Sequence, residues 1–275
     1  MTNITASQVN ELRKQTGLGM MDCKSALVES NGDFEKAIEI LRKKGQKVAA
    51  KRADREANEG VVLSATNEEN NFGAIIVLNC ETDFVAKNTD FISFAEQILS
   101  LALLNKTKTL EEVLILQIGG KSIKENIIEQ TGVIGEKISL SSFEIVDAEF
   151  VTSYIHPGNK LSSIVGFNLN IEQDVAKNIC MQIAAMNPIA IDEQTVSKDV
   201  LDREYNIGLE QAKEEGKPEQ ILDKIAEGRL KKFLKENTLL NQPFIKDNGV
   251  TVKQYLSQQK ENAQVADFKR IGLGY

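Results

Sequence analysis

The sequence contains one short stretch whose residue types are suited to phosphate binding. Gly119-Gly120-Lys121-Ser122 precedes a segment with helical spacing, and phosphate-binding loops end in Gly-Lys-Ser at a helix N-terminus. Such a loop also needs a glycine five residues before its second one, where this chain has Ile115. We therefore expect no nucleotide binding at this stretch.

The other residues that could do chemistry are too scattered to predict an active site. His156 is the only histidine, and no Ser or Cys is paired with it in a triad pattern. Cys23, Cys80 and Cys180 are widely spaced without a Cys-x-x-Cys motif, so they predict neither a disulfide framework nor a zinc site. We expect a chain that is not an enzyme and that uses no cofactor or metal.

Composition narrows the partners that the chain can have. Lys and Arg total 33 against 40 Asp and Glu, and a net charge of -7 argues against general nucleic-acid binding. No apolar run approaches the ~20 residues that span a bilayer, and the N-terminus lacks the pattern of a signal peptide. We expect a cytoplasmic protein that binds neither nucleic acid nor membranes.

A basic run between Arg42 and Arg55 interrupts this acidic composition. It is long enough to touch phosphates, but charge runs on helices usually face water. The simpler interpretation is the solvated face of a helical linker.

Residues 1–45 predict a small three-helix bundle with glycines between the helices. Thr5 and Gln8 match a capping box, and Gly17 matches a helix stop. The expected apolar faces are Met20, Cys23 and Leu27 in the second helix, and Phe34, Ala37, Ile38 and Leu41 in the third, which we expect to end before Gly45.

After the basic run the apolar period becomes strand-like. Residues 61–65 and 73–79 predict a hairpin, and a mainly helical stretch follows to Leu104. Capping boxes at Thr109/Glu112 and Ser122/Glu125 predict two more helices. A second set of strands covers 138–146, 150–155 and 161–170, and a helix over 173–186 closes it.

The order of hairpin and then helix occurs twice, and both junctions contain Val-Ala-Lys-Asn, at 85–88 and 175–178. We therefore expect an internal duplication that gives two related subdomains with antiparallel sheets.

Residues 197–237 predict a helical pair that is broken at Gly216-Lys217-Pro218. Its apolar residues are spaced by three and four, which is typical of an antiparallel coiled-coil hairpin; they are Leu201, Tyr205, Gly208 and Ala212, then Leu222, Ala226, Leu230 and Phe233. An extended segment over 265–271 is expected to return to the second subdomain.

The predicted fold class is therefore α+β, with five consecutive segments. These are a helical bundle and basic linker at 1–55, a first core subdomain at 56–139, the first part of a second subdomain at 140–196, the inserted hairpin at 197–237 and the second part of that subdomain at 238–275.

Met20 and Met21 are neighbours in a predicted helix, so their side chains point about 100° apart. Both cannot point squarely into one small core, and we expect one of them to be exposed. A flexible filler of an irregular gap and an adaptable contact surface both fit this pair.

Two long motifs resemble the elongation factor Ts family. The first includes Thr5-Ala6-Ser7, Leu12-Arg13, Thr16-Gly17 and Gly19-Met20-Met21-Asp22-Cys23-Lys24. The second is Asn79-Cys80-Glu81-Thr82-Asp83-Phe84-Val85-Ala86-Lys87, which contains the family's Thr-Asp-Phe-Val signature. The motifs Gly216-Lys217-Pro218, Glu227-Gly228-Arg229 and Gln242-Pro243-Phe244 extend the resemblance over nearly the whole chain.

The resemblance implies an N-terminal bundle similar to ubiquitin-associated domains, and a partner, elongation factor Tu, in its GDP-bound and nucleotide-free forms. Residues matching Arg13, Met20 and Met21 contact the partner's nucleotide domain in the family. Residues matching Asp83 and Phe84, between Thr82 and Val85 of the signature, wedge beside its magnesium site. His156 matches a further contact residue, although the Pro157 loop differs from the commoner pattern. Family members commonly continue into a C-terminal helical module, for which this chain offers no matching residues.

The resemblance thus implies a factor that promotes GDP release without binding nucleotide itself. One alternative is an adaptor whose bundle recruits another protein, and a weaker one is a nucleotide hydrolase that uses Gly120-Lys121-Ser122. The sequence leaves open whether the chain is a monomer, forms a homodimer, or enters a 2:2 complex with its partner.

Helical spacing and the family resemblance predict different positions for Phe84. An aromatic residue in the first turn of a helix is usually buried, so spacing alone predicts a core position. The resemblance predicts an exposed side chain that contacts the partner.

Overall fold

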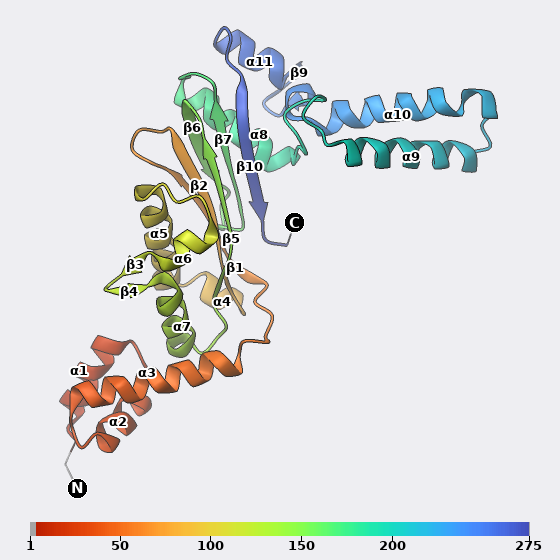
Figure 1. Cartoon of the computed structure of the whole chain (residues 1–275). Coiled ribbons are helices and arrows are strands. Elements are labelled where there is room, and N and C mark those ends of the chain that lie inside the picture. The colour runs from red at the N-terminus through yellow and green to blue at the C-terminus, as the bar shows by residue number, and fades with distance from the viewer. Residues whose placement is uncertain (1–3, 275) are drawn as a thin grey trace. The chain divides into compact units, whose positions relative to one another are not determined.

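The computed structural model describes residues 4–274 and confirms the α+β class (Figure 1). The contacts within the chain divide it into two compact units. The first contains the described residues up to Leu63, Ile75–Glu144 and the residues from Gly272 onward, and the second contains Ser64–Ala74 and Ile145–Ile271. The five predicted domains and the internal duplication concern folding and descent, and they stay predictions.

Three helices at the N-terminus form a bundle with its own core. They are α1 (Ala6–Thr16), α2 (Met20–Glu29) and α3 (Phe34–Lys51). The Thr5/Gln8 capping box and the left-handed Gly17 after α1 are confirmed. The buried cluster comprises Val9, Leu12, Cys23, Ala26, Leu27, Ala37 and Leu41. The placement of Met20 on the apolar face of Cys23 and Leu27 is wrong, since its side chain is 52% exposed.

The prediction that the third helix ends before Gly45 is wrong, and α3 continues to Lys51. At Gly45 it crosses α7 (Ile123–Ile134). A Cβ atom added to Gly132 of α7 would lie 2.5 Å from the Cα of Gly45. Glycine disfavours a helix interior by about 1 kcal/mol relative to alanine. Here it lets the two backbones approach, and the packing that results offsets this preference.

The first unit contains a set of helices and most of the sheet formed by strands β1, β2 and β5. Its elements are β1 (Glu59–Thr66), β2 (Phe72–Cys80), α4 (Asp83–Ala86), α5 (Thr89–Leu104), α6 (Leu110–Ile115), β3 (Gln117–Ile118), β4 (Lys121–Ser122), α7 and β5 (Ser139–Asp147), and the sheet order is β1-β2-β5. The predicted second set of strands is thus divided between two sheets, since its first strand pairs with β2.

The helix caps of this unit follow the sequence signals with one exception. The Ser122/Glu125 capping box is present. At α6 only half of the predicted box forms: Thr109 accepts from the Glu112 N–H, but the Glu112 carboxylate accepts from the Lys108 N–H at 2.6 Å.

The second unit has a sheet with one helix packed on it. Strands β6 (Phe150–Ile155) and β7 (Leu161–Phe167) pair antiparallel, and β10 (Val265–Gly272) joins β7. Val175, Ile179 and Ile183 of α8 (Gln173–Met186) belong to the same buried cluster as Phe150 and Phe167 of the strands. The extended segment expected at the end of the chain is present and joins this sheet. The remaining elements are β8 (Pro243–Phe244), β9 (Asp247–Thr251) and α11 (Val252–Gln259).

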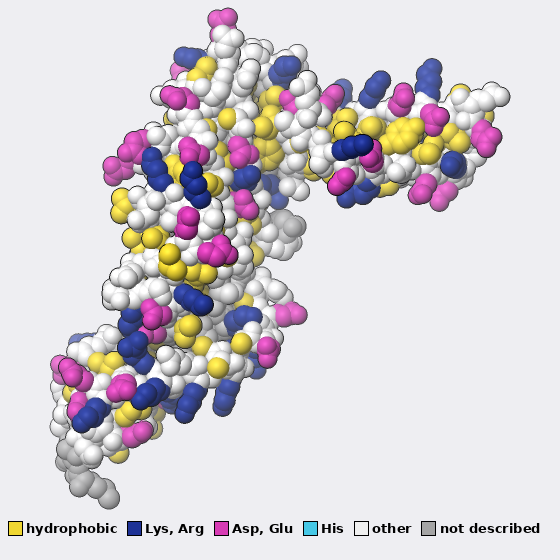
Figure 2. Space-filling model, in the orientation of Figure 1, with side chains coloured by type: hydrophobic (Ala, Val, Ile, Leu, Met, Phe, Trp, Pro, Cys, Tyr) yellow, Lys and Arg dark blue, Asp and Glu magenta, His cyan; other side chains and the backbone are white. Residues whose placement is uncertain are grey.

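Helices α9 (Lys198–Glu214) and α10 (Leu222–Asn237) lie side by side and confirm the predicted helical pair (Figure 1). Gly208 lies against Ala226, and Arg229 of α10 donates to the Gly208 carbonyl at 3.4 Å. Figure 2 shows hydrophobic side chains along the visible face of this pair. At its base, Ala190, Val196 and Leu234 form a separate buried cluster.

Gly132→Ala is expected to lower the urea midpoint of unfolding, because its Cβ meets the backbone of Gly45 and not a movable side chain. Overpacking of this kind costs about 1 to 3 kcal/mol, more than the helix preference of alanine returns. The matched control is Gly228→Ala in α10, where an added Cβ has no atom within 4 Å. The control is expected to raise the midpoint, and equal shifts for the two variants would contradict the importance of the crossing.

Residues 205–229 are expected to be replaceable by a short Gly-Ser turn without unfolding the rest of the chain. The base of the pair stays intact in this variant, since the Ile189 N–H still donates to the Asn237 carbonyl. The melting temperature should change by less than about 4 °C, the shift that ~1 kcal/mol gives at this size. Leu234→Ala, within the base cluster, serves as a destabilising comparison. A collapse of the melting transition in the shortened variant would mean that the helical pair supports the main core.

Candidate functional site

Phe84 is the most exposed large hydrophobic side chain in the part of the chain that the structure describes. It lies in the four-residue helix α4, directly after β2, and is 82% exposed. Thr82 caps this helix, since its hydroxyl accepts from the Val85 N–H at 3.5 Å. The core position that spacing alone predicts for Phe84 is therefore wrong, because α4 directs the ring into solvent.

The turn before Phe84 is held by a carboxylate from a distant part of the chain. Glu136, which follows the left-handed Gly135 at the end of α7, accepts from the Glu81 and Thr82 N–H groups at 3.1 and 3.0 Å. Its second oxygen accepts from the Thr82 hydroxyl at 2.8 Å. Hydrogen bonds to a charged acceptor are stronger than those between neutral groups. The turn is thus fixed although α4 is very short.

A second carboxylate, Glu81, ties the same turn to the end of α3. Arg52 donates to both of its oxygens at 2.7 and 2.9 Å, and the Lys137 N–H donates at 2.6 Å. The hydrogen bond from Lys137, followed by that from Arg52, holds the pKa of Glu81 below its ordinary value against the effect of burial. Glu81 is therefore ionised at neutral pH and bridges two segments of the first unit.

The segment after α3 is fixed further by Lys137, whose ammonium group donates to the Ala53 and Arg55 carbonyls at 2.8 and 2.7 Å. The interpretation of the basic run as only a solvated face is therefore wrong for Arg52. The Arg52 side chain is 29% exposed, and its guanidinium is paired with Glu81.

Asp83 and Val85 complete the signature turn. The Asp83 carboxylate accepts from the Lys87 ammonium at 2.6 Å, one helical turn later, and this contact raises the pKa of Lys87. Val85 is half-buried. The turn thus presents an aromatic ring beside a carboxylate that remains partly accessible.

The bundle carries a second exposed apolar surface. Met20 and Met21 in the first turn of α2 are 52% and 71% exposed, so both point outward. Arg13 is exposed in the last turn of α1, and the three residues flank the same short connection between the helices. The prediction was that one Met is exposed, and the structure exposes both.

His156 lies in the second unit, in the turn between β6 and β7. Its ring is exposed, and its Nδ1 atom lies 3.0 Å from the Tyr154 hydroxyl. Gly158 and Asn159 in this turn have the positive φ angles that a tight reversal requires.

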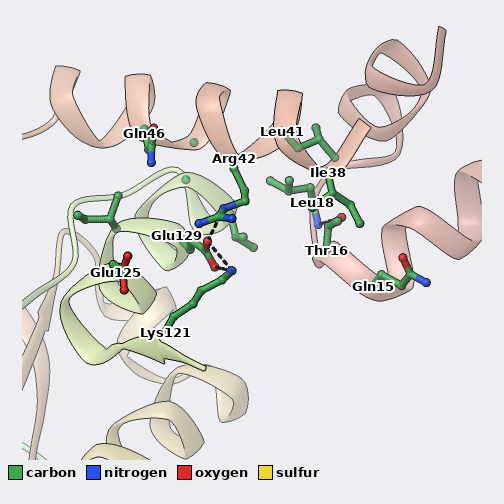
Figure 3. Close-up of a pocket in the computed structure, with 14 residues that line it drawn as sticks. Gln15, Thr16, Leu18, Ile38, Leu41, Arg42, Gln46, Lys121, Glu125 and Glu129 are labelled. Carbon is green, nitrogen blue, oxygen red and sulfur yellow. Dashed lines mark hydrogen bonds and ion pairs between the residues drawn. The ribbon is translucent and has the colours of Figure 1, made fainter. Parts of the chain in front are cut away.

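The Gly-Gly-Lys-Ser stretch has structural partners. Lys121 donates to both oxygens of Glu129 at 2.6 and 2.7 Å, and Ser122 caps α7. Figure 3 shows Arg42 and Lys121 reaching Glu129 from opposite sides, at the wall of a cavity of about 190 Å³ between α1, α3 and α7. The positive charge of Lys121, which a phosphate would need, is thus already paired with the Glu129 carboxylate.

Cys23, Cys80 and Cys180 are buried thiols that form no disulfide. Burial raises the pKa of Cys180 to about 12, so this thiol is not poised to be a nucleophile. Among residues 4–274, no group of three or more His, Cys, Asp and Glu side chains is placed to hold a metal ion. Within the same residues, no helix has the length and apolar character needed to cross a membrane.

Sequence reasoning missed the residues that support the signature turn. Glu81 belongs to the second motif and directly precedes its Thr-Asp-Phe-Val signature, so its position could have pointed to it. Glu136 and Lys137 lie more than 50 residues away in the sequence, and no local pattern marks them.

Comparisons with known proteins agree with this picture. A family model described as Elongation factor TS matches residues 81–275. A protein named Elongation factor Ts from Christiangramia forsetii is 51% identical over 276 residues, covering 100% of both chains. Proteins of the same name from Amoebophilus asiaticus and Porphyromonas gingivalis are 53% and 51% identical, each over 98% of this chain.

Glu81→Gln is expected to lower stability at neutral pH, and this loss should shrink in acid. Because the folded-state pKa of Glu81 lies below its ordinary value of 4.5, its contribution is full above that pH and is lost as the pH falls through the lowered value. Melting temperatures of both proteins between pH 7 and the acid limit of folding measure the difference. Glu39→Gln, which breaks an exposed pair with Lys43, is the control and should have little effect. A gap between Glu81→Gln and the parent protein that stays constant with pH would contradict the assigned role of Glu81.

Proposed function

The chain belongs to the elongation factor Ts family, whose role is in translation elongation, and we propose that it binds elongation factor Tu and promotes its release of GDP. The observation that carries this proposal is Phe84, an aromatic side chain 82% exposed on a turn held by two carboxylates. Burying such a side chain in a partner contributes about 1.5 to 3 kcal/mol. A rigid support lets that free energy act on the partner, because little is lost in ordering the turn.

The chemistry of the partner's nucleotide site explains how a wedge can act. A magnesium ion demands a nearly ideal octahedral shell, so small displacements of its ligands weaken its hold on GDP. Factor and nucleotide then weaken each other reciprocally on the same protein. A ~10⁴-fold effect needs about 5.5 kcal/mol of differential binding. We assign the wedge to Phe84, with Asp83, Thr82 and Val85 beside it.

A second contact is proposed at the bundle, through Arg13, Met20 and Met21. Methionine adapts to an irregular surface, and two linked contacts bind more tightly than either one alone. His156 is proposed as a further contact in the second unit, supported by its exposure in the turn after β6.

We also propose that the N-terminal bundle is similar to ubiquitin-associated domains and that α9 with α10 forms a coiled-coil hairpin. The chain acts in the cytoplasm on the GDP-bound and nucleotide-free forms of its partner. It is not an enzyme, does not itself bind nucleotide, and forms no contacts with nucleic acid or membranes. A homodimer and a 2:2 complex are both compatible with these surfaces.

Phe84→Ala is expected to slow GDP release with little change in folding. A buried phenylalanine loses about 3 to 5 kcal/mol when truncated, but an exposed one does not. The measurement pairs thermal unfolding with stopped-flow release of fluorescent GDP from elongation factor Tu.

Two controls accompany this variant. Phe91→Ala, at 3% exposure in α5, should destabilise the fold, and Leu104→Ala, at 80% exposure, should leave both folding and exchange unchanged. Wild-type exchange by a folded Phe84→Ala variant would refute the wedge. No stimulation of GDP release by the parent chain would favour an adaptor instead.

A further inference from the structure

We propose that Glu136 is a positioning residue that holds Phe84 in the orientation required for nucleotide exchange. This inference rests on the proposed function, since it concerns how the wedge is supported. Glu136 does not belong to the signature motif, and it lies 54 residues after Thr82 in the sequence.

The turn cannot hold this orientation by itself. Helix α4 has four residues, and a helix of this length has no independent stability. The ring of Phe84 points into solvent, so packing in a core does not fix it either. The backbone hydrogen bonds within the turn come from the Ala86 and Lys87 N–H groups, and they leave the Glu81 and Thr82 N–H groups to be bound from outside it.

Glu136 supplies these hydrogen bonds through both carboxylate oxygens. Oε2 accepts from the N–H groups of Glu81 and Thr82, and Oε1 accepts from the Thr82 hydroxyl. The same hydroxyl oxygen accepts from the Val85 N–H. The carboxylate is thus connected to both ends of the backbone segment that carries Phe84, through one intervening side chain.

Glu81 cannot substitute for Glu136, because it faces a different set of groups. Its carboxylate is used by Arg52 and by the Lys137 N–H. Glu81 therefore joins the turn to the end of α3, and Glu136 defines the conformation of the turn itself. Gly135, left-handed at φ 79°, ends α7 and lets the chain bring Glu136 to this place.

Loss of the Glu136 carboxylate should impair exchange more than folding. The N–H groups and the hydroxyl that would lose this acceptor belong to Glu81 and Thr82, which are only partly buried, so water can bind them instead. The turn would then sample several orientations, and a small misplacement of a reacting group lowers rates by up to about 10²-fold. We expect Glu136→Ala to slow stimulated GDP release about tenfold at saturating factor, within that range.

A double-mutant cycle with Phe84 tests whether Glu136 acts through the wedge. The variants are Glu136→Ala, Phe84→Ala and both together, with Glu96→Ala on the exposed side of α5 as the matched control. In the Phe84→Ala background, Glu136→Ala should slow release by less than about twofold more, because the two changes remove the same action. Multiplying effects would overturn the proposal, as would wild-type exchange by Glu136→Ala. Glu136→Gln, which retains an acceptor oxygen, should recover most of the rate.

A measurement without the partner separates this inference from the proposed function. The chain has no Trp, so Phe84→Trp introduces a single indole at the wedge position. Time-resolved anisotropy should show faster local motion of this indole when Glu136→Ala is added, with an unchanged melting transition. Unchanged local motion overturns the positioning role. If the indole is mobilised but the parent chain does not stimulate GDP release, the proposed function fails and the support of the turn stands.

Discussion

Helices α3 and α7 bring their backbones into contact at Gly45 and Gly132, where neither helix carries a side chain. Helix α3 belongs to the N-terminal bundle, and the residues that follow α7 hold the turn of Phe84. The crossing therefore places the bundle and the turn on one continuous support. Arg42 and Lys121 reinforce it, because both pair with Glu129 of α7.

The residues after α7 extend this support by hydrogen bonds and not by apolar packing. Glu136 holds the turn, the Lys137 N–H holds Glu81, and the Lys137 ammonium holds the carbonyls after α3. These groups are partly exposed, so their net contribution to global stability is modest. Their geometric effect is larger, since each interaction links two segments that would otherwise move separately.

Local signals in the sequence predicted most of the elements. Gly17, Ser122 and Thr5 act as expected because a stop or a cap depends on atoms a few residues away. Gly45 was misread because its effect depends on a partner in α7 that lies far away in the sequence. The same reason explains the pairing of β5 with β2, since strand periodicity identifies a strand but does not identify its neighbour.

The candidate site shows the same limit. The exposure of Phe84 agrees with the prediction from the family resemblance and contradicts the prediction from spacing, because spacing does not show which side of a four-residue helix meets the core. Periodicity could show that Met20 and Met21 diverge, but it placed Met20 toward the core. The role of Glu136 could not be predicted from the sequence, since a single glutamate after a glycine has no distinctive pattern.

The apolar groups of the site, Phe84 and Met21, project from short or terminal parts of helices. Leaving such groups in water is unfavourable in the free protein. At Phe84 the hydrogen bonds to Glu136 fix the turn that keeps the ring exposed. An exchange factor needs this arrangement for a thermodynamic reason. Its affinity for the nucleotide-free partner must exceed its affinity for the GDP-bound form. If the turn had to become ordered on binding, the cost would lower its affinity for both forms of the partner. A turn that is ordered before binding lets most of the contact free energy distinguish the two states of the partner.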